Sequence, residues 1–390
     1  MKSLLFILIL SCITSCRTND PADNKPVSPL ADKTSLTAAE AAEYTDFLQT
    51  VWKDSVKTAL TESFEKKVLV KGKYQMKMDW RIFGNLPSDG RSLYISLHGG
   101  GGAPASVNDQ QWMNQIGLYK PAEGVYLCPR AIENTWDLHF RPESDGFYEE
   151  VIRMAVTHLG VNPDKVYLMG YSAGGDGVWR LAPRMADHWA AASMMAGHPG
   201  DVSLLSLRNL PFMIWCGALD SAYNRNEECQ KRIDEMAALH EADPAGYIFE
   251  GHIVEGKEHW MDLEDKAALP WMAKYTRNPY PDRVVWCQGD EPKTDFYWLG
   301  VPASEARKGM TVRAEREGNT VRILSCDYSS VTIHLNDQMM DLDKPVKVVY
   351  GDRTLFDGSV TRKPAVLRQS LRERGDLSYM FPVRVDVKIR

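Results

Sequence analysis

Strand-like and helix-like segments alternate along residues 93–274, and this order constrains the fold more than any other feature of the chain. Short apolar runs with the length and composition of buried strands occur at 93–97, 125–128, 166–169, 190–195, 212–216 and 248–254. Helical patterns lie between or after them at 147–159, 174–185, 227–240 and 259–274. Strands that alternate with helices form a parallel sheet covered on both faces. We therefore expect an α/β fold with a doubly wound, mostly parallel sheet.

The segments on either side differ from this pattern. Thr37 and Glu40 form a capping-box signal for a helix over 37–60, and residues 66–70 and 74–83 alternate as strands do. After about residue 277 the chain shows short strands, hairpin turns at Gly318 and Gly351, and one helix over 365–374. We divide the chain into an export signal (1–16), a flexible tether (17–34), an α/β domain (35–278) and a small, mostly-β accessory domain (279–390).

Composition excludes some classes of function. A chain of 390 residues with 44% hydrophobic side chains can form one large core and a smaller second unit. The formal net charge of −6, with Lys and Arg scattered, disfavours a nucleic-acid partner. No CxxC motif or His/Cys cluster indicates a metal site.

The first residues have the pattern of a targeting segment. Lys2 precedes an apolar run over residues 4–10 that is too short to span a bilayer and is typical of an export signal. Ile13-Thr-Ser-Cys16 resembles the lipobox of bacterial lipoproteins; the alternative at Cys12 leaves a very short apolar core. We therefore expect lipidation of Cys16 and a location in the bacterial cell envelope, on the periplasmic or outer-membrane side. Plain secretion is the alternative.

Five further cysteines lie in the body of the chain: Cys128, Cys216, Cys229, Cys287 and Cys326. An odd number of thiols cannot all pair. The first two lie in apolar strand-like runs and are expected to be small buried side chains. A single disulfide among the other three is left open.

Gly170-Tyr-Ser172-Ala-Gly174 follows one of the expected strands and precedes a helix. In a G-x-S-x-G elbow, small residues on both sides of the serine permit a sharp turn that lifts its hydroxyl out of the sheet. This placement makes Ser172 the candidate nucleophile.

A second signal follows the strand at 93–97, where His98 is followed by four glycines. Glycines at this position allow backbone N–H groups to approach a developing oxyanion. We expect donors at Gly100 and Gly101, with the Ala173 N–H as their partner. His98 is expected to orient this loop through hydrogen bonds.

These motifs resemble those of the α/β-hydrolase superfamily, within it the poly(3-hydroxybutyrate) depolymerase-like and feruloyl esterase-like serine esterases. The resemblance rests on the His98-Gly-Gly-Gly loop, Gly-Tyr-Ser172-Ala-Gly-Gly, Gly217-Ala-Leu-Asp220 and the late His259, and covers about residues 65–275. It implies an α/β-hydrolase catalytic domain.

In this fold the catalytic residues follow the order Ser, acid, His. Asp220 stands just past the second strand after the elbow, whereas Glu227, Glu228 and Asp234 lie on the next expected helix. Among the histidines after Asp220, His259 alone follows the last parallel strand. We expect Ser172 to attack an acyl carbon while His259 takes its proton and Asp220 orients His259. This mechanism requires no cofactor.

Other residues on the loops after these strands are candidates for the substrate pocket. Trp136 and His139 follow the strand at 125–128, and His198 follows the strand at 190–195. Tyr171 adjoins the nucleophile. Structural packing is an equal alternative for each histidine, and Asp176 is expected to be a helix-start charge.

The function predicted is hydrolysis of a small-molecule or glycan-linked ester. A prolyl oligopeptidase-like serine peptidase is the runner-up, because it shares the Gly-x-Ser-x-Gly-Gly elbow. The signal, tether and first helix leave no room for its propeller before about residue 65, and the connection 195–212 is too short for a large lid. A non-catalytic envelope lipoprotein that binds polysaccharide is a third possibility, which the complete Ser, Asp and His set disfavours. The oligomeric state is left open.

Overall fold

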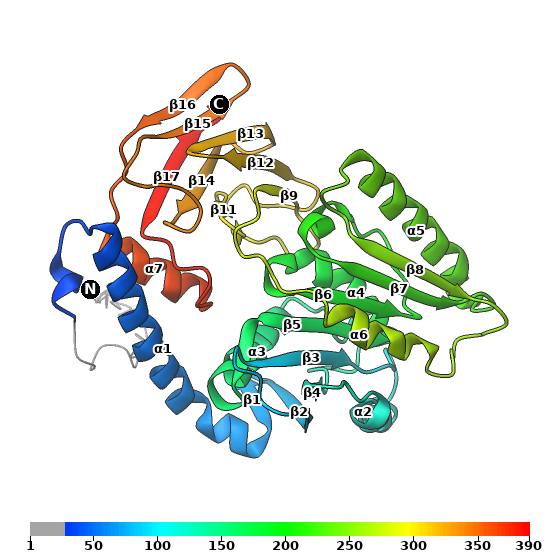
Figure 1. The fold of residues 1–390 in the computed structure, drawn as a ribbon. Helices are drawn as coiled ribbons and strands as arrows, with labels where there is room; N and C mark the ends of the chain where they lie inside the picture. Colours follow the sequence, from blue (N-terminus) through cyan, green and yellow to red (C-terminus); the bar gives the residue numbers. More distant parts are fainter. Residues whose placement is uncertain (1–27) are drawn as a thin grey trace, which may run out of the picture.

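The computed structural model describes residues 28–390, and the export signal, Cys16 and most of the expected tether lie outside this range. Its largest element is an eight-stranded sheet in the order β1-β2-β4-β3-β5-β6-β7-β8 (Figure 1). β1 and β2 run antiparallel to their neighbours, and all later pairs are parallel. The strands are β1 (Val68–Lys71), β2 (Tyr74–Phe83), β3 (Arg91–Leu97), β4 (Gly124–Pro129), β5 (Val161–Tyr171), β6 (Ala191–Met195), β7 (Phe212–Gly217) and β8 (Phe249–Val254).

Helices cover both faces of this sheet because its side chains alternate between two apolar clusters. Leu93, Ile95 and Leu97 of β3 pack in the cluster shared with α3 (Ser144–His158), α4 (Ala173–Arg184) and α5 (Arg225–Ala242). Tyr94 points to the other face, beneath α2 (Ala105–Leu118) and α6 (Ala268–Met272). The predicted doubly wound, mostly parallel sheet is confirmed.

Two helices differ from the sequence analysis. It found no helix in residues 98–124, yet α2 lies there; few of its side chains are buried, among them Asn108, Gln115 and Ile116, so it has little apolar periodicity. The helix expected over 259–274 begins later. Asp262 and Leu263 have φ of 53° and 64°, which no right-handed helix accommodates, and a 3₁₀ turn at Glu264–Ala267 leads into α6.

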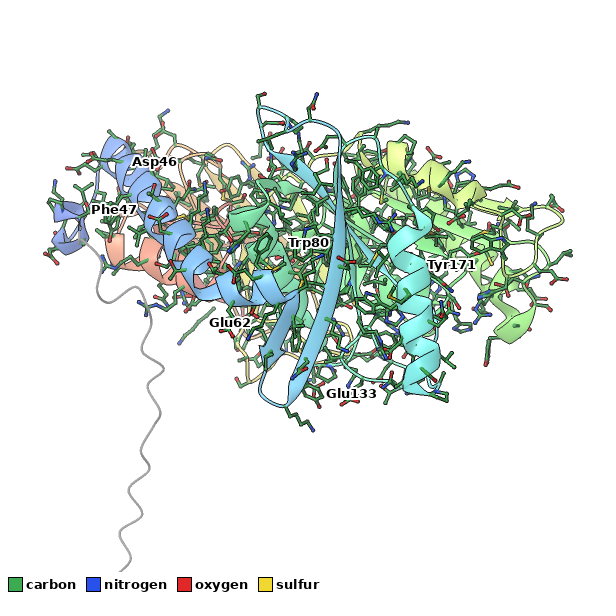
Figure 2. The ribbon with its side chains drawn as sticks, turned by 90° about the horizontal axis from the view of Figure 1, so that it is seen from below. Asp46, Phe47, Glu62, Trp80, Glu133 and Tyr171 are labelled. Carbon is green, nitrogen blue, oxygen red and sulfur yellow. The ribbon has the colours of Figure 1, made fainter. Side chains whose placement is uncertain are left out.

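The long helix α1 (Ala38–Lys66) runs from the C-terminal helix to the antiparallel edge of the eight-stranded sheet (Figures 1 and 2). Its capping box is formed as predicted: the Glu40 N–H donates to Thr37 Oγ1, and the Thr37 N–H donates to the Glu40 carboxylate. Near its start, Tyr44 packs in a cluster with residues of the C-terminal helix. Near its end, Phe64 stacks on Trp80 of β2, with ring centroids 5.2 Å apart.

The predicted tether extends too far. Residues 29–32 form a 3₁₀ helix capped by Ser28, and Leu30 is buried beside α1 and the C-terminal helix. The Arg368 guanidinium donates to the Ala31 carbonyl. The folded part of the chain therefore includes Pro29 and the residues after it, because burial of the apolar Leu30 side chain in this cluster stabilises the segment.

After residue 279 the chain is mostly β, as predicted. One sheet has the order β10-β11-β14-β17 and the other β16-β15-β13-β12-β9. Gly318 and Gly351 take φ of 55° and 56° at the two expected hairpin turns. The elements are β9 (Arg283–Cys287), β10 (Asp295–Phe296), β11 (Leu299–Gly300), β12 (Thr311–Glu317), β13 (Thr320–Cys326), β14 (Ser330–Leu335), β15 (Val346–Tyr350), β16 (Arg353–Gly358), α7 (Pro364–Arg374) and β17 (Val383–Lys388).

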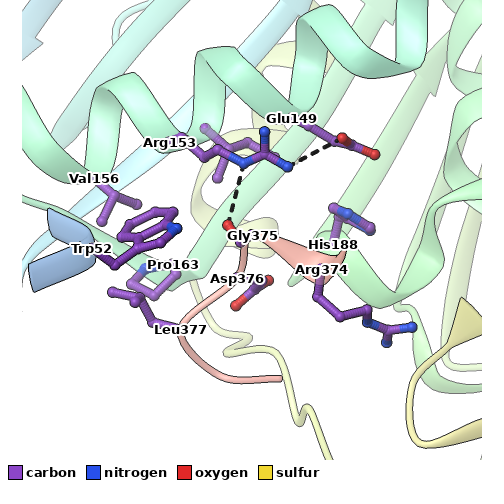
Figure 3. A pocket seen from close by; sticks show the side chains of 11 residues that line it. Trp52, Glu149, Arg153, Val156, Pro163, His188, Arg374, Gly375, Asp376 and Leu377 are labelled. Atoms are coloured by element: carbon purple, nitrogen blue, oxygen red, sulfur yellow. Dashed lines mark hydrogen bonds and ion pairs between the residues drawn. The ribbon is translucent and has the colours of Figure 1, made fainter. Parts of the chain in front are cut away.

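The C-terminal region is bound to the α/β domain by buried polar contacts. The Arg277 guanidinium is buried and donates to Asp164 Oδ1 at 2.8 Å, to Asp376 Oδ2 at 2.7 Å and to the Asp187 carbonyl at 2.7 Å. Arg153 of α3 reaches the Gly375 carbonyl in the same junction (Figure 3). Asp164 is near the start of β5 and Asp187 precedes β6, so this junction lies at the opposite end of these strands from Ser172.

In residues 28–390, none of the helices combines the length and the apolar character needed to cross a membrane.

Candidate active site

Ser172 occupies a strained turn between β5 and α4. Its backbone has φ 59° and ψ −122°, a conformation that non-glycine residues rarely adopt. The turn needs glycine on both sides: a Cβ on Gly170 would lie 2.4 Å from the Gly174 carbonyl oxygen, and a Cβ on Gly174 would lie 2.2 Å from that of Leu97. The spacing of the motif therefore follows from close packing of β5, α4 and β3.

The structure brings the three predicted catalytic side chains together. Ser172 Oγ lies 2.9 Å from His259 Nε2, and His259 Nδ1 lies 2.7 Å from Asp220 Oδ2. Because the carboxylate accepts, Nδ1 carries a proton, and Nε2 is left free to accept the serine proton. Asp220 is 2% exposed, whereas 42% of the His259 side chain is accessible. The acid is thus sheltered from water and the base faces the site.

Asp220 is held by the loop between β7 and α5. Its carbonyl accepts from the Asn226 N–H at 3.1 Å, and Arg225 Nη1 lies 3.4 Å from its Oδ1. Arg225 was not identified from the sequence. It gives the second carboxylate oxygen a charged partner, so both oxygens of Asp220 have donors.

Tyr171, predicted as a pocket residue, also braces the histidine loop. Its hydroxyl donates to the His259 carbonyl at 2.6 Å and accepts from the Met261 N–H at 3.1 Å. Burial raises the pKa of Tyr171, so the hydroxyl stays protonated and remains a donor. The residue beside the nucleophile therefore fixes the backbone that carries the base.

In the loop after β3, one of the two predicted oxyanion donors, the Gly101 N–H, is already bound to another group. Gly100 and Gly101 have φ of 116° and 118°, so the chain turns sharply beside Ser172. The Gly101 N–H, however, donates to Asn108 Oδ1 at 3.1 Å inside the protein. The remaining predicted donors are the N–H of Gly100 and that of Ala173, which is among the first N–H groups of α4 that lack a partner within the helix.

Asn108 of α2 clamps this loop. Its side-chain amide nitrogen donates to the carbonyls of Gly101 at 3.1 Å and Ala103 at 3.2 Å, while its oxygen accepts from the Gly101 N–H. A Cβ on Gly100 would lie 2.0 Å from Asn108 Oδ1, so only glycine fits between the clamp and the site. Sequence reasoning missed Asn108 because it missed α2.

Two buried histidines support the same loop. His98 Nε2 accepts from the Ala131 N–H at 3.1 Å, so its Nδ1 carries the proton and donates to the Gly99 carbonyl at 2.6 Å. His139 Nε2 donates to the His98 carbonyl at 2.8 Å. Burial lowers the pKa of His98 to about 4 and lowers that of His139 well below its ordinary value. Both rings are neutral and hold the backbone of this loop by hydrogen bonds. This agrees with the expectation for His98, whereas the prediction that His139 lines the substrate pocket is wrong.

A pocket of about 600 Å³ opens beside the nucleophile, between α2 and the histidine loop. Tyr171 lines it, as predicted, together with side chains that the sequence analysis did not identify: Gln111, Asn114, Gln115, Leu118 and Trp260. Its wall is therefore aromatic on one side and amide-bearing on the other.

The two other predicted pocket residues lie outside this cavity. The His198 N–H donates to Asp176 Oδ1 at 2.6 Å, and His198 Nδ1 accepts from the Gly200 N–H at 3.0 Å. Asp176 thus holds the loop after β6, and burial raises the pKa of its carboxyl group. Trp136 is 66% exposed and stacks edge-on with Phe140. It stands on the surface outside the pocket wall.

Within the described residues, no group of three or more His, Cys, Asp or Glu side chains is arranged to hold a metal ion.

Comparison with known proteins finds no matching family and no matching curated protein. Solved structures do match over part of the chain. A thermostable esterase is 16% identical, with a TM-score of 0.41, over 54% of this chain and 63% of its own length, so less than two thirds of that protein is matched. A ferulic acid esterase is 15% identical, with a TM-score of 0.32, over 51% of this chain and 97% of its own. A putative dipeptidyl aminopeptidase IV from Bacteroides ovatus is 13% identical, with a TM-score of 0.37, over 53% of this chain and 34% of its own length.

Proposed function

We propose that this protein is a serine hydrolase that cleaves carboxylic esters through an acyl-enzyme. The observation that carries the proposal is the continuous relay from Ser172 Oγ through His259 to the buried Asp220, with contacts of 2.9 and 2.7 Å. A serine hydroxyl is a weak nucleophile until an adjacent base takes its proton. The strained turn at Ser172 presents this hydroxyl to the pocket.

The steps follow from the positions of the groups. Ser172 Oγ attacks the acyl carbon while its proton passes to His259 Nε2, and Asp220 stabilises the resulting imidazolium. The N–H groups of Gly100 and Ala173 bind the oxyanion of the tetrahedral intermediate. His259 then returns the proton to the leaving alcohol. Water enters, loses a proton to His259 and releases the acid from Ser172.

The surroundings of the pocket favour esters carried on a larger molecule. The connection between β6 and β7 contains only a short 3₁₀ helix, Leu205–Asn209, and no large lid. Exposed aromatic side chains stand on the loops that follow the strands: Trp136 at 66%, Tyr223 at 78% and Trp260 at 46% accessible. Such rings bind extended partners by stacking and apolar contact. Glycan-linked acetyl or feruloyl esters are the substrates we propose.

The test compares kcat/KM on p-nitrophenyl acetate, methyl ferulate and a matched set of peptide amides. We expect clear preference for the esters, and loss of at least about 10⁴-fold in kcat for Ser172→Ala, because triad members act as a unit. Inertness toward every ester beside rapid amide cleavage would replace this proposal with a serine peptidase. Full retention of esterase activity in Ser172→Ala would remove Ser172 from the mechanism.

We also propose that Cys16 carries lipid and anchors the hydrolase to a bacterial envelope membrane. Lys2, the apolar run over 4–10 and Ile13-Thr-Ser-Cys16 support this. Several acyl chains anchor a protein stably where a single chain is marginal. Cys16→Ser should release the protein from the membrane fraction or block its maturation. An unmodified mature N-terminus in mass spectrometry would contradict the anchor.

A further inference from the structure

Two cysteines meet in the core beneath the loop that carries Asp220. Cys216 is on β7, and Cys229 is in the second turn of α5; both are fully buried in the same apolar cluster. The backbone register explains why they meet. Ile214 of β7 pairs with Gly251 of β8, and α5 lies so close to this pair that a Cβ on Gly251 would be 2.5 Å from Ile233.

From the contact between α5 and the Ile214–Gly251 pair, the two cysteines lie at similar distances along β7 and α5. Cys216 is two residues beyond Ile214 on the same face of β7, which corresponds to about 7 Å along a strand. Cys229 is four residues before Ile233 on the same face of α5, which corresponds to about 6 Å along a helix. Since α5 runs back along β7, Cys229 lies over Cys216. The Cys229 thiol thus neighbours that of Cys216, and Cys229 Sγ also contacts the Gly197 carbonyl at 3.5 Å.

Cys287 and Cys326, which the sequence left open as possible disulfide partners, are kept apart by a strand. Cys287 of β9 pairs with Thr311, and Cys326 of β13 pairs with Val312, so β12 separates them. Two strand spacings amount to about 10 Å, which exceeds the Cα separation that a disulfide spans. A bond between Cys287 and Cys326 is therefore excluded, and all five cysteines of the described residues are free thiols in this structure.

We propose that Cys216 and Cys229 form a disulfide when the chain folds in the presence of a dithiol-disulfide oxidant. One thiolate attacks the oxidant's S–S bond, forms a mixed disulfide and releases the oxidant's first thiol. The second thiolate then attacks the cysteine sulfur of this mixed disulfide and releases the oxidant's second thiol. One S–S bond forms between the cysteines, the oxidant's S–S bond breaks, and the oxidant leaves with the two electrons and two protons as two thiols. The hydrogen bond with Cys216 and burial raise the pKa of the Cys229 thiol, so the reaction belongs to folding, before the thiols are buried.

The position of this bond gives it a consequence for the active site. It would close a loop over residues 217–228, which contains both Asp220 and Arg225. Cross-linking the two ends of such a loop removes conformational freedom from the unfolded chain and prevents α5 from separating from β7. The bond would therefore keep the acid near His259 under conditions that loosen the loop, without taking part in the reaction.

The experiment refolds the full chain from guanidinium with either oxidised glutathione or dithiothreitol, alkylates all free thiols under denaturation, and maps peptides by mass spectrometry. We expect a cross-linked peptide joining Cys216 to Cys229 only in the oxidised sample, with Cys128, Cys287 and Cys326 alkylated in both. Alkylation of Cys216 and Cys229 in both samples, or pairing of either cysteine with a different one, would overturn the proposal.

Thermal unfolding provides a second readout. The oxidised wild-type chain should melt higher than the reduced chain by on the order of 5 °C. Cys229→Ala should abolish this difference, whereas Cys326→Ala, a buried cysteine in the C-terminal region, should retain it. A difference that persists in Cys229→Ala would assign the stabilisation to another bond. The peptide map uses the wild-type chain, so its result does not depend on how well Cys229→Ala or Cys326→Ala folds.

Discussion

At the scale of single residues, two groups converge on the carboxylate of Asp220. His259 Nδ1 contacts one oxygen at 2.7 Å and Arg225 contacts the other at 3.4 Å. The first contact fixes the tautomer of His259, and the second makes the buried acid part of a charged pair. Such a carboxylate cannot be replaced by a neutral amide without changing which histidine nitrogen carries the proton.

Asp220→Asn should therefore lower kcat by roughly 10³- to 10⁴-fold while leaving KM within a few-fold, because the geometry persists but the tautomer is wrong. Steady-state kinetics on p-nitrophenyl acetate measure the effect. Glu227→Gln, seven residues later at the start of α5, is the matched control and should stay close to wild type. A larger loss in Glu227→Gln than in Asp220→Asn would show that the acid is misassigned.

The sequence allowed Ser172, Asp220 and His259 to be placed because chain order and strand ends locate them. It did not distinguish Gly100 from Gly101 as an oxyanion donor. That distinction depends on Asn108, whose side chain binds the Gly101 N–H across the fold. His139 and His198 were candidates because their loops leave the correct edge of the sheet, but their rings and backbone serve neighbouring loops instead.

At the scale of elements, α2 is the part of the fold whose absence from the sequence analysis mattered most. It provides the pocket wall and the clamp on the oxyanion loop, yet its side chains are largely polar. Polar side chains that line the pocket or bind the neighbouring loop occupy positions where apolar residues would otherwise reveal a helix by their periodicity. The strands and the C-terminal hairpins were predictable because their apolar runs and Gly turns are local signals.

Asn108→Ala should free the Gly101 peptide and allow the oxyanion loop to relax. Because oxyanion binding acts in the transition state, we expect kcat to fall by about 10- to 100-fold with a small change in KM. Gln110→Ala, an exposed change on the same helix, is the control for α2 stability. Equal losses in both variants, or a change confined to KM, would contradict the role of Asn108 as a clamp.

The two histidines behind this loop predict a dependence of stability on pH. The folded-state pKa of His98 is about 4, below its ordinary value of 6.5, so the folded state favours the neutral ring. The corresponding stabilisation is complete above pH 6.5 and is lost as pH falls toward 4, amounting to about 3 kcal/mol for His98. Denaturant unfolding at pH 7.5 and 4.5 measures it. His98→Gln should flatten this dependence; an unchanged slope would contradict burial of neutral His98.

At the scale of the whole molecule, α1 and the Arg277 junction join the C-terminal region to the α/β domain at the end remote from Ser172. The apolar core is continuous across this junction, since residues of both regions belong to one cluster. The C-terminal region therefore packs on the sheet at the end opposite Ser172 and leaves the pocket beside Ser172 open. This arrangement was not predictable from the sequence, because it depends on contacts such as that between Arg277 and Asp376, which are far apart in the chain.

Arg277→Met should lower the free energy of unfolding by about 3–5 kcal/mol, because the carboxylates of Asp164 and Asp376 lose their buried counter-charge. Chemical denaturation followed by tryptophan fluorescence measures this loss. Arg384→Met removes an exposed pair with Asp386 and should change stability by no more than about 0.5 kcal/mol. Similar values for the two variants would show that the junction does not hold the regions together.

The most direct test of the central claim is covalent labelling of the folded protein with a fluorophosphonate, followed by intact-mass measurement and peptide mapping. Such probes react with a serine that a neighbouring base has activated. We expect one adduct per chain, located on Ser172, and none on Ser172→Ala under the same conditions. Absence of an adduct on the folded wild-type chain, or an adduct on a different serine that persists in Ser172→Ala, would contradict the assignment of Ser172 as the nucleophile.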